Sequence, residues 1–151
     1  MPIQMIRAGL AAFAVATLLV AGCGVLGEPS LIRTAYPTTL AGSAWSAVSV
    51  AGQPTVVGSE PTAVFTVDRI EGTTGCNGYF ASYQYATGAI EIREMGSTAI
   101  GCDGPIGATE QRFTAAMQGA STVSIDPEGR LVLDGSGGSI TFVVAPQQAG
   151  G

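Results

Sequence analysis

Short apolar segments separated by turn-forming residues recur from Leu40 almost to the C-terminus, and this spacing limits the possible folds most strongly. The segments are LAGSAWSAVSVAG, TAVFTV, RIEGTT, GYFASYQY, AIEIR, STVSID, RLVLD and ITFVV. Turns are indicated at Asp68-Arg69, at Thr87-Gly88, at 127–129 and in the Gly-rich run GSGGS. About eight short strands at this spacing predict an antiparallel sheet that curls or closes into a barrel.

One segment, IGATEQRFTAAMQGA, breaks the strand pattern. Its apolar residues fall at helical spacing, at Phe113, Ala116, Met117 and Ala120. This spacing predicts an amphipathic helix of about ten residues that begins at Pro105 or Thr109 and ends near Gly119. Such a helix must bury its apolar stripe against the sheet, so the predicted fold class is α+β.

Strand parity also predicts which side chains share a face. In the first strand Trp45, Ala47 and Ser49 fall on one face, and Val48 and Val50 fall on the other. We interpret Trp45 as an anchor of the core.

The strand 78–85 places Tyr79, Tyr83 and Tyr85 on one face and Phe80 on the other. A row of tyrosines either packs in the core, or at its rim, with satisfied hydroxyls, or forms an amphipathic contact surface. Core or rim packing is the favoured interpretation. If the face is exposed, these tyrosines are the first candidates for a surface that binds a partner or ligand.

The N-terminal residues have the pattern of an export signal. Arg7 precedes an apolar run from Ala8 to Ala21, which is shorter than the roughly 20 residues that a membrane-spanning helix needs. The run ends in Val20-Ala21-Gly22-Cys23, which resembles a bacterial lipobox. We expect 1–22 to be a lipoprotein signal peptide and Cys23 to be lipidated, with palmitate as one acyl chain. The alternative is an ordinary secretory signal with an incidental cysteine.

Composition divides the rest of the chain and limits its partners. We expect a flexible tether at 23–39, a domain at 40–145 and a disordered tail at 146–151. Without residues 1–22 the net charge is about −6, and no basic face for nucleic acid is indicated. The predicted location is the cell membrane or outer envelope, with the domain on the extracytoplasmic side and held to the membrane by the N-terminal lipid.

The remaining thiols, Cys76 and Cys102, are predicted to form a structural disulfide, because the exported domain lies in an oxidising compartment. A redox-active pair and a zinc site are less favoured alternatives. The spacing is not that of a CxxC motif, and the sequence contains no histidine. Asn77-Gly78, which includes the only asparagine, is interpreted as a turn because both residue types tolerate positive φ.

No arrangement of catalytic residues is evident. A Ser-His-Asp or Cys-His site requires a histidine. The close carboxylates Glu91 and Glu94, and Asp126 and Glu128, are interpreted as solvated charges at strand ends and turns. The run DGSGGS lacks the lysine and following helix of a phosphate-binding loop, so it is interpreted as a hairpin loop. We therefore expect no enzymatic activity, cofactor or bound metal.

The order of these motifs resembles the META domain of HslJ-like bacterial lipoproteins. The most specific features are GCNGYFASY at 75–83 and the Ser-Thr-x-x-x-Cys at 97–102, within a resemblance over about 38–144. Two departures are Ile100-Gly101, where the family usually has methionine and alanine, and a shorter turn at Asp68-Arg69. The resemblance implies a small α+β fold, an envelope location and a link to heat or antibiotic stress.

Two functions follow as expectations. The first is a non-catalytic, lipid-anchored envelope protein that acts as an accessory or interaction module under stress, with an envelope protein as a possible partner. The alternative is an inhibitor or binder of a specific enzyme or small molecule. A protruding loop at 72–78 or 135–138 would favour the alternative.

Overall fold

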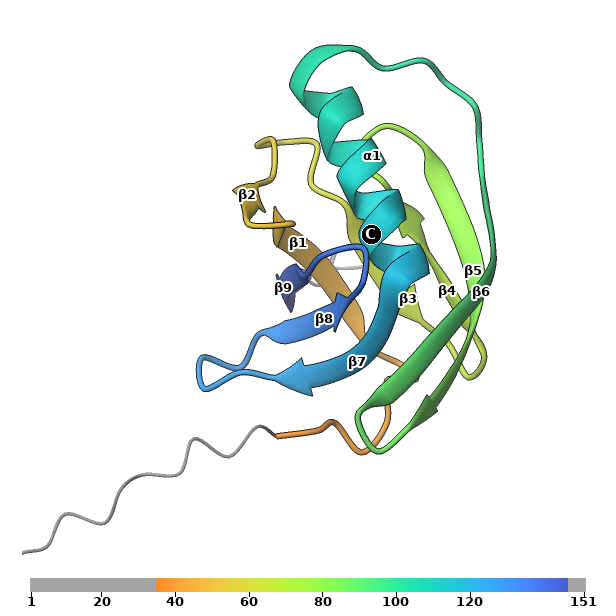
Figure 1. Cartoon of the computed structure of the whole chain (residues 1–151), viewed down its shortest axis with the longest axis vertical. Coiled ribbons are helices and arrows are strands. Elements are labelled where there is room, and N and C mark those ends of the chain that lie inside the picture. The colour runs from red at the N-terminus through yellow and green to blue at the C-terminus, as the bar shows by residue number, and fades with distance from the viewer. Residues whose placement is uncertain (1–34, 147–151) are drawn as a thin grey trace, which may run out of the picture. The chain divides into compact units, whose positions relative to one another are not determined.

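The computed structural model describes residues 35–146, which contain nine strands and one helix (Figure 1). The elements are β1 (Ala44–Val50), β2 (Gln53–Pro54), β3 (Thr62–Phe65), β4 (Arg69–Thr73), β5 (Gly78–Ala86), β6 (Ala89–Ser97), α1 (Gly104–Gly119), β7 (Ala120–Ile125), β8 (Leu131–Gly135) and β9 (Ile140–Val144). All the predicted strands are present. The short strand β2 was not predicted, and β6 extends further than its apolar pattern indicated.

The strands form one antiparallel barrel. Each strand from β3 to β9 pairs with its neighbour in sequence, and β1 pairs with both β3 and β9, which closes the sheet. The weakest seam lies between β6 and β7, where the only paired residues are Ala89 and Thr122. The predicted α+β class, with a curled or barrel-like sheet and one packed helix, is confirmed.

The helix closes the core through its apolar stripe. Phe113, Ala116 and Met117 of α1 are buried, and so is Ala120, which is the first residue of β7. The ring of Phe113 makes edge-to-face contacts with Tyr79 and Phe142, with centroids 5.4 and 6.4 Å apart. Such contacts add to the free energy gained by burying the rings. The predicted stripe is therefore confirmed, although the helix has 16 residues and begins at Gly104.

The first strand departs from simple alternation. The β1–β9 register shifts between Ala47 and Ser49, so that Val48 lies in a β-bulge. As a result Ala47 and Val50 are both fully buried, and Val48 is 38 % exposed. The predicted faces are therefore wrong beyond Ala47. Trp45 is only half-buried at the edge of the core, where its Nε1 donates a hydrogen bond to Ser43 Oγ.

Residues just before the barrel pack against it. Ala35 forms an isolated β-bridge with Ile125, the ring of Tyr36 packs on Gly88, and Pro37 O accepts a hydrogen bond from the Tyr85 hydroxyl. The predicted tether is therefore held against the barrel at this end. The predicted signal peptide, Cys23 and most of the tail lie outside the described residues. Within 35–146, α1 is not long and apolar enough to cross a bilayer.

Candidate functional site: a polar junction beside an open groove

A disulfide joins the turn between β4 and β5 to the segment that leads into α1. Its cysteines are the predicted pair, Cys76 and Cys102, with Cα atoms 6.2 Å apart. The bridge holds together two chain segments that are 26 residues apart in sequence.

Asn77 lies beside the disulfide and is 96 % buried, with a relative exposure of 4 %. Its Nδ2 donates to Ile100 O at 3.0 Å and to Glu110 Oε1 at 2.7 Å. Its Oδ1 accepts from Thr98 Oγ1 at 2.8 Å and from Ile100 N at 2.7 Å. One side chain therefore connects the turn, the segment after β6 and the helix.

Thr74 completes this network from the other side of the turn. Its hydroxyl donates to Glu110 Oε1 at 2.8 Å and accepts from the backbone N of Asn77 at 2.9 Å. We call the whole network the polar junction. It consists of Thr74, Cys76, Asn77, Thr98, Ile100, Cys102 and Glu110. Hydrogen bonds satisfy the buried side chains of Thr74 and Asn77, as buried polar groups require.

The junction corrects the interpretation of Asn77-Gly78 as a turn with positive φ. Gly75 is the residue in that turn with positive φ, at 94°, and neither Asn77 nor Gly78 has one. Asn77 is instead required for its amide, which bonds to partners 21 to 33 residues away in sequence. Sequence reasoning also missed Glu110, because it lies on the polar side of the predicted helix and its partners are distant in the chain.

The tyrosines of β5 face inward. Tyr79 and Tyr83 are 4 % and 7 % exposed, and their hydroxyls donate to Thr62 O at 2.9 Å and Thr66 O at 2.7 Å. Burial raises the pKa of Tyr79, and burial followed by the nearby Asp68 carboxylate raises the pKa of Tyr83. Tyr85 is half-buried. The favoured interpretation, core or rim packing, is the observed one. The condition for a partner surface, exposure of this face, is not met, because the face points into the barrel.

The opposite face of β5 exposes Phe80, whose exposed fraction is 48 %. In the sheet Phe80 lies between Glu71 of β4 and Gly96 of β6. A Cβ on Gly96 would come within 2.7 Å of Phe80 Cζ, so the absence of a side chain lets the ring lie on the sheet. The Arg69 guanidinium carbon is 5.2 Å from the ring centroid, which is cation–π range.

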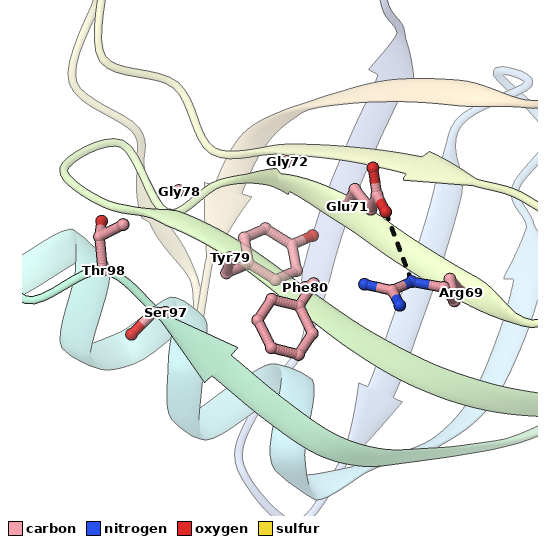
Figure 2. Close-up of a pocket in the computed structure, with 8 residues that line it drawn as sticks. All are labelled: Arg69, Glu71, Gly72, Gly78, Tyr79, Phe80, Ser97 and Thr98. Carbon is pink, nitrogen blue, oxygen red and sulfur yellow. Dashed lines mark ion pairs between the residues drawn. The ribbon is translucent and has the colours of Figure 1, made fainter.

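Around Phe80 an open groove runs over β4, β5 and the end of β6 (Figure 2). We call it the Phe80 groove. Its lining residues are Arg69, Glu71, Gly72, Gly78, Tyr79, Phe80, Ser97 and Thr98. The cavity volume is about 540 Å³, within the range typical of small-molecule sites. Arg69 Nε and Glu71 Oε1 are 3.4 Å apart at one side of it, and Ser97 and Thr98 lie at the other.

The carboxylate pairs that the sequence analysis singled out do not line the Phe80 groove. Glu91 pairs with Arg93 at 2.6 Å, and Asp126 pairs with Arg130 at 2.7 Å; all but the Asp126 side chain are largely exposed. Burial pushes the pKa of Asp126 upward, but hydrogen bonds from the Arg130 backbone and guanidinium outweigh it, so the pKa is lowered. Of the four carboxylates predicted to be solvated, Glu91, Glu94 and Glu128 are exposed, whereas Asp126 is partly buried.

The two loops proposed for insertion into a partner are both held down. Ser136 N donates to Gly119 O at 3.1 Å, which keeps the β8–β9 loop against the end of α1. The turn at 72–78 is fixed by the disulfide and by Asn77. Within residues 35–146, no three His, Cys, Asp or Glu side chains gather closely enough to hold a metal ion.

Comparison with known proteins identifies structures with the same fold and the family of the domain. Two solved structures share the fold. An NMR structure of a protein from Burkholderia xenovorans has a TM-score of 0.61, with 20 % sequence identity, and the match covers 72 % of this chain and 85 % of that one. A second NMR structure has a TM-score of 0.59, with 20 % identity over 72 % of this chain and 94 % of the other. No curated protein matches significantly. The META domain profile matches residues 38–147, and the chain therefore belongs to the META domain family.

Proposed function

We propose that this protein is a non-catalytic, lipid-anchored protein of the cell envelope, whose META domain is a stress-related accessory module that binds another envelope component. The observation that carries the binding role is the Phe80 groove. It combines a half-exposed aromatic ring with accessible charged and hydroxyl groups on a closed barrel. Exposed aromatic and arginine side chains of this kind are enriched where proteins bind partners.

Binding suits the groove better than catalysis. The Arg69 and Glu71 side chains are paired and about half exposed, at 51 % and 58 %, so water screens their charges. The charged groups of the groove are in a position to accept and donate hydrogen bonds to a bound molecule.

The anchor part of the proposal rests on the sequence around Cys23 and has its own test. Full-length protein isolated from envelopes should partition into detergent and carry the mass of acyl chains. The Cys23→Ala variant should be released or accumulate unprocessed. Soluble, unacylated wild-type protein would contradict the anchor and leave the binding role to be judged separately.

The binding part is tested by photocrosslinking in cells. A photoreactive amino acid at Ser97, an exposed residue of the groove, should give specific crosslinked products, with yield increasing under envelope stress. The matched control is the same amino acid at Ser121, which is exposed on β7 outside the groove. Equal products from both positions would show that the groove has no special role.

The alternative is an inhibitor or binder of a specific enzyme or small molecule. The observation in favour of a small molecule is the volume of the groove, about 540 Å³. The loops at 72–78 and 135–138 do not support the role of an enzyme inhibitor, because both are held against the domain and neither is free to insert into a partner. Crosslinking from Ser97 to one periplasmic enzyme would nevertheless favour it over the accessory role.

A further inference from the structure

We propose that the Phe80 groove is a saccharide-binding site, and that its ligand is an uncharged sugar unit of an envelope glycan. The inference rests on the proposed function and names the ligand class of the same groove. It follows from the combination of an aromatic platform, a floor without side chains and a rim of hydrogen-bonding groups.

The platform and floor match the apolar face of a pyranose ring. A pyranose presents a patch of C–H groups on one face, which packs against an aromatic ring. Phe80 offers a ring held on the sheet surface, with nearly half of the residue exposed at 48 %. Gly72 and Gly78 line the groove beside it without bulky side chains. This leaves room for a flat ligand to lie along the sheet.

The rim matches the hydroxyl edge of a sugar. Each sugar hydroxyl both donates and accepts a hydrogen bond, so a sugar site needs both kinds of group. The guanidinium of Arg69 supplies donors, and the carboxylate of Glu71 supplies acceptors. Thr98 donates its own hydroxyl proton to Asn77, which leaves the Thr98 oxygen able to accept. The Ser97 hydroxyl is an exposed group that can do either.

Charge favours an uncharged ligand over the other molecules of an envelope. Arg69 and Glu71 lie within 3.4 Å, so the groove holds one charge of each sign. The full chain has a net charge of −5, which repels anionic polymers and lipid headgroups.

The polar junction keeps the site in one shape. Thr98 N donates to Gly78 O at 3.0 Å across one end of the groove, and Thr98 Oγ1 is held by Asn77. The floor and one rim are thus fixed before a ligand arrives. Preorganisation of this kind reduces the entropy lost on binding.

The test is saturation-transfer difference NMR on the full-length protein in detergent micelles. The probes are chitotetraose, an N-acetylated oligosaccharide, and maltotetraose, which lacks acetamido groups. Saturation should pass to pyranose C–H protons of at least one probe, and the comparison of the two identifies which sugar chemistry is recognised. Phe80→Ala should weaken binding at least about fivefold, Phe80→Trp should retain it, and Arg69→Ala should also weaken it.

The control variant is Val57→Ser, because Val57 is 93 % exposed and does not line the groove. It should leave the transfer unchanged. No transfer to either probe at millimolar concentration, or transfer that Phe80→Ala leaves unchanged, would overturn the inference. If Ser97 crosslinks a protein in cells while neither sugar binds, the saccharide inference fails and the proposed binding function stands. If neither occurs, both fail.

Discussion

The polar junction and the Phe80 groove are neighbours with opposite characters. In the junction, Asn77 is buried and its amide is fully used in hydrogen bonds inside the protein. In the groove, Phe80 is half exposed, and the Arg69–Glu71 pair faces solvent. The two share Thr98, which donates to Asn77 and lines the groove. The difference indicates that one region maintains the fold while the adjacent region is available to bind.

The largest expected effect is loss of the disulfide. The Cys76→Ala, Cys102→Ala double variant should lower the free energy of unfolding by about 3 to 4 kcal/mol, because the unfolded chain regains the entropy that the closed loop removes. Urea unfolding of the full-length protein measures this. Reductant should produce a similar loss in the wild type and none in the variant. A loss below about 1 kcal/mol would show that the bridge does little for the junction.

Removing Asn77 should have the next largest effect. Asn77→Ala removes a buried amide whose hydrogen bonds to Ile100 N, Thr98 Oγ1 and the Glu110 carboxylate are partly buried, and should cost about 2 to 3 kcal/mol. The measurement is again urea unfolding. Gln84→Ala is the matched control, since Gln84 is an exposed amide on β5, the strand that follows Asn77, and should change little. Equal losses of unfolding free energy in the two variants would show that the Asn77 amide contributes no more to stability than an exposed amide does.

The pH dependence of stability tests whether the hydroxyl of Tyr79, on the inner face of β5, is buried. Burial raises its pKa in the folded protein above the unfolded value of about 10. Its contribution is therefore present below about pH 10 and is lost as the pH rises towards the folded pKa. Tyr79→Phe should cost about 1 kcal/mol at neutral pH through the lost bond to Thr62 O. The variant should also lose stability less steeply at alkaline pH, measured by unfolding between pH 9 and about pH 11. Identical slopes would contradict the burial of this hydroxyl.

The smallest expected effect on stability is in the groove. Phe80→Ala should change the free energy of unfolding by about 1 kcal/mol or less, because only about half of this side chain is buried in the folded protein. Thermal unfolding of the variant and the wild type side by side measures the difference. A loss as large as that of Asn77→Ala would make Phe80 part of the structural framework and end the contrast between the regions.

Features with a local signature could be predicted from the sequence. The strands follow from alternation and turn residues, and the apolar stripe of α1 follows from its spacing, as at Phe113 and Met117. The α+β barrel-like class follows from these elements together. The shift at Val48 could not be predicted, because a bulge is set by pairing with β9, and alternation alone continues through it.

The two regions of the candidate site were predictable to different degrees. The pair Cys76 and Cys102 could be predicted because few thiols remain in the chain. The role of Asn77 depends on Glu110, 33 residues away, and no local pattern links them. The tyrosines drew attention by their number, yet parity alone does not say which face of β5 is inside. Phe80, isolated on the other face, became a candidate only through its neighbours in β4 and β6.

The measurement that tests the central claim most directly is the crosslinking yield from a photoreactive residue at Ser97, compared between wild type and Phe80→Ala in living cells. The account predicts that Phe80→Ala removes most of the crosslinked product while the protein remains folded, with the same amount present in the envelope. An unchanged yield from folded Phe80→Ala protein would contradict the claim that this groove is where the domain binds.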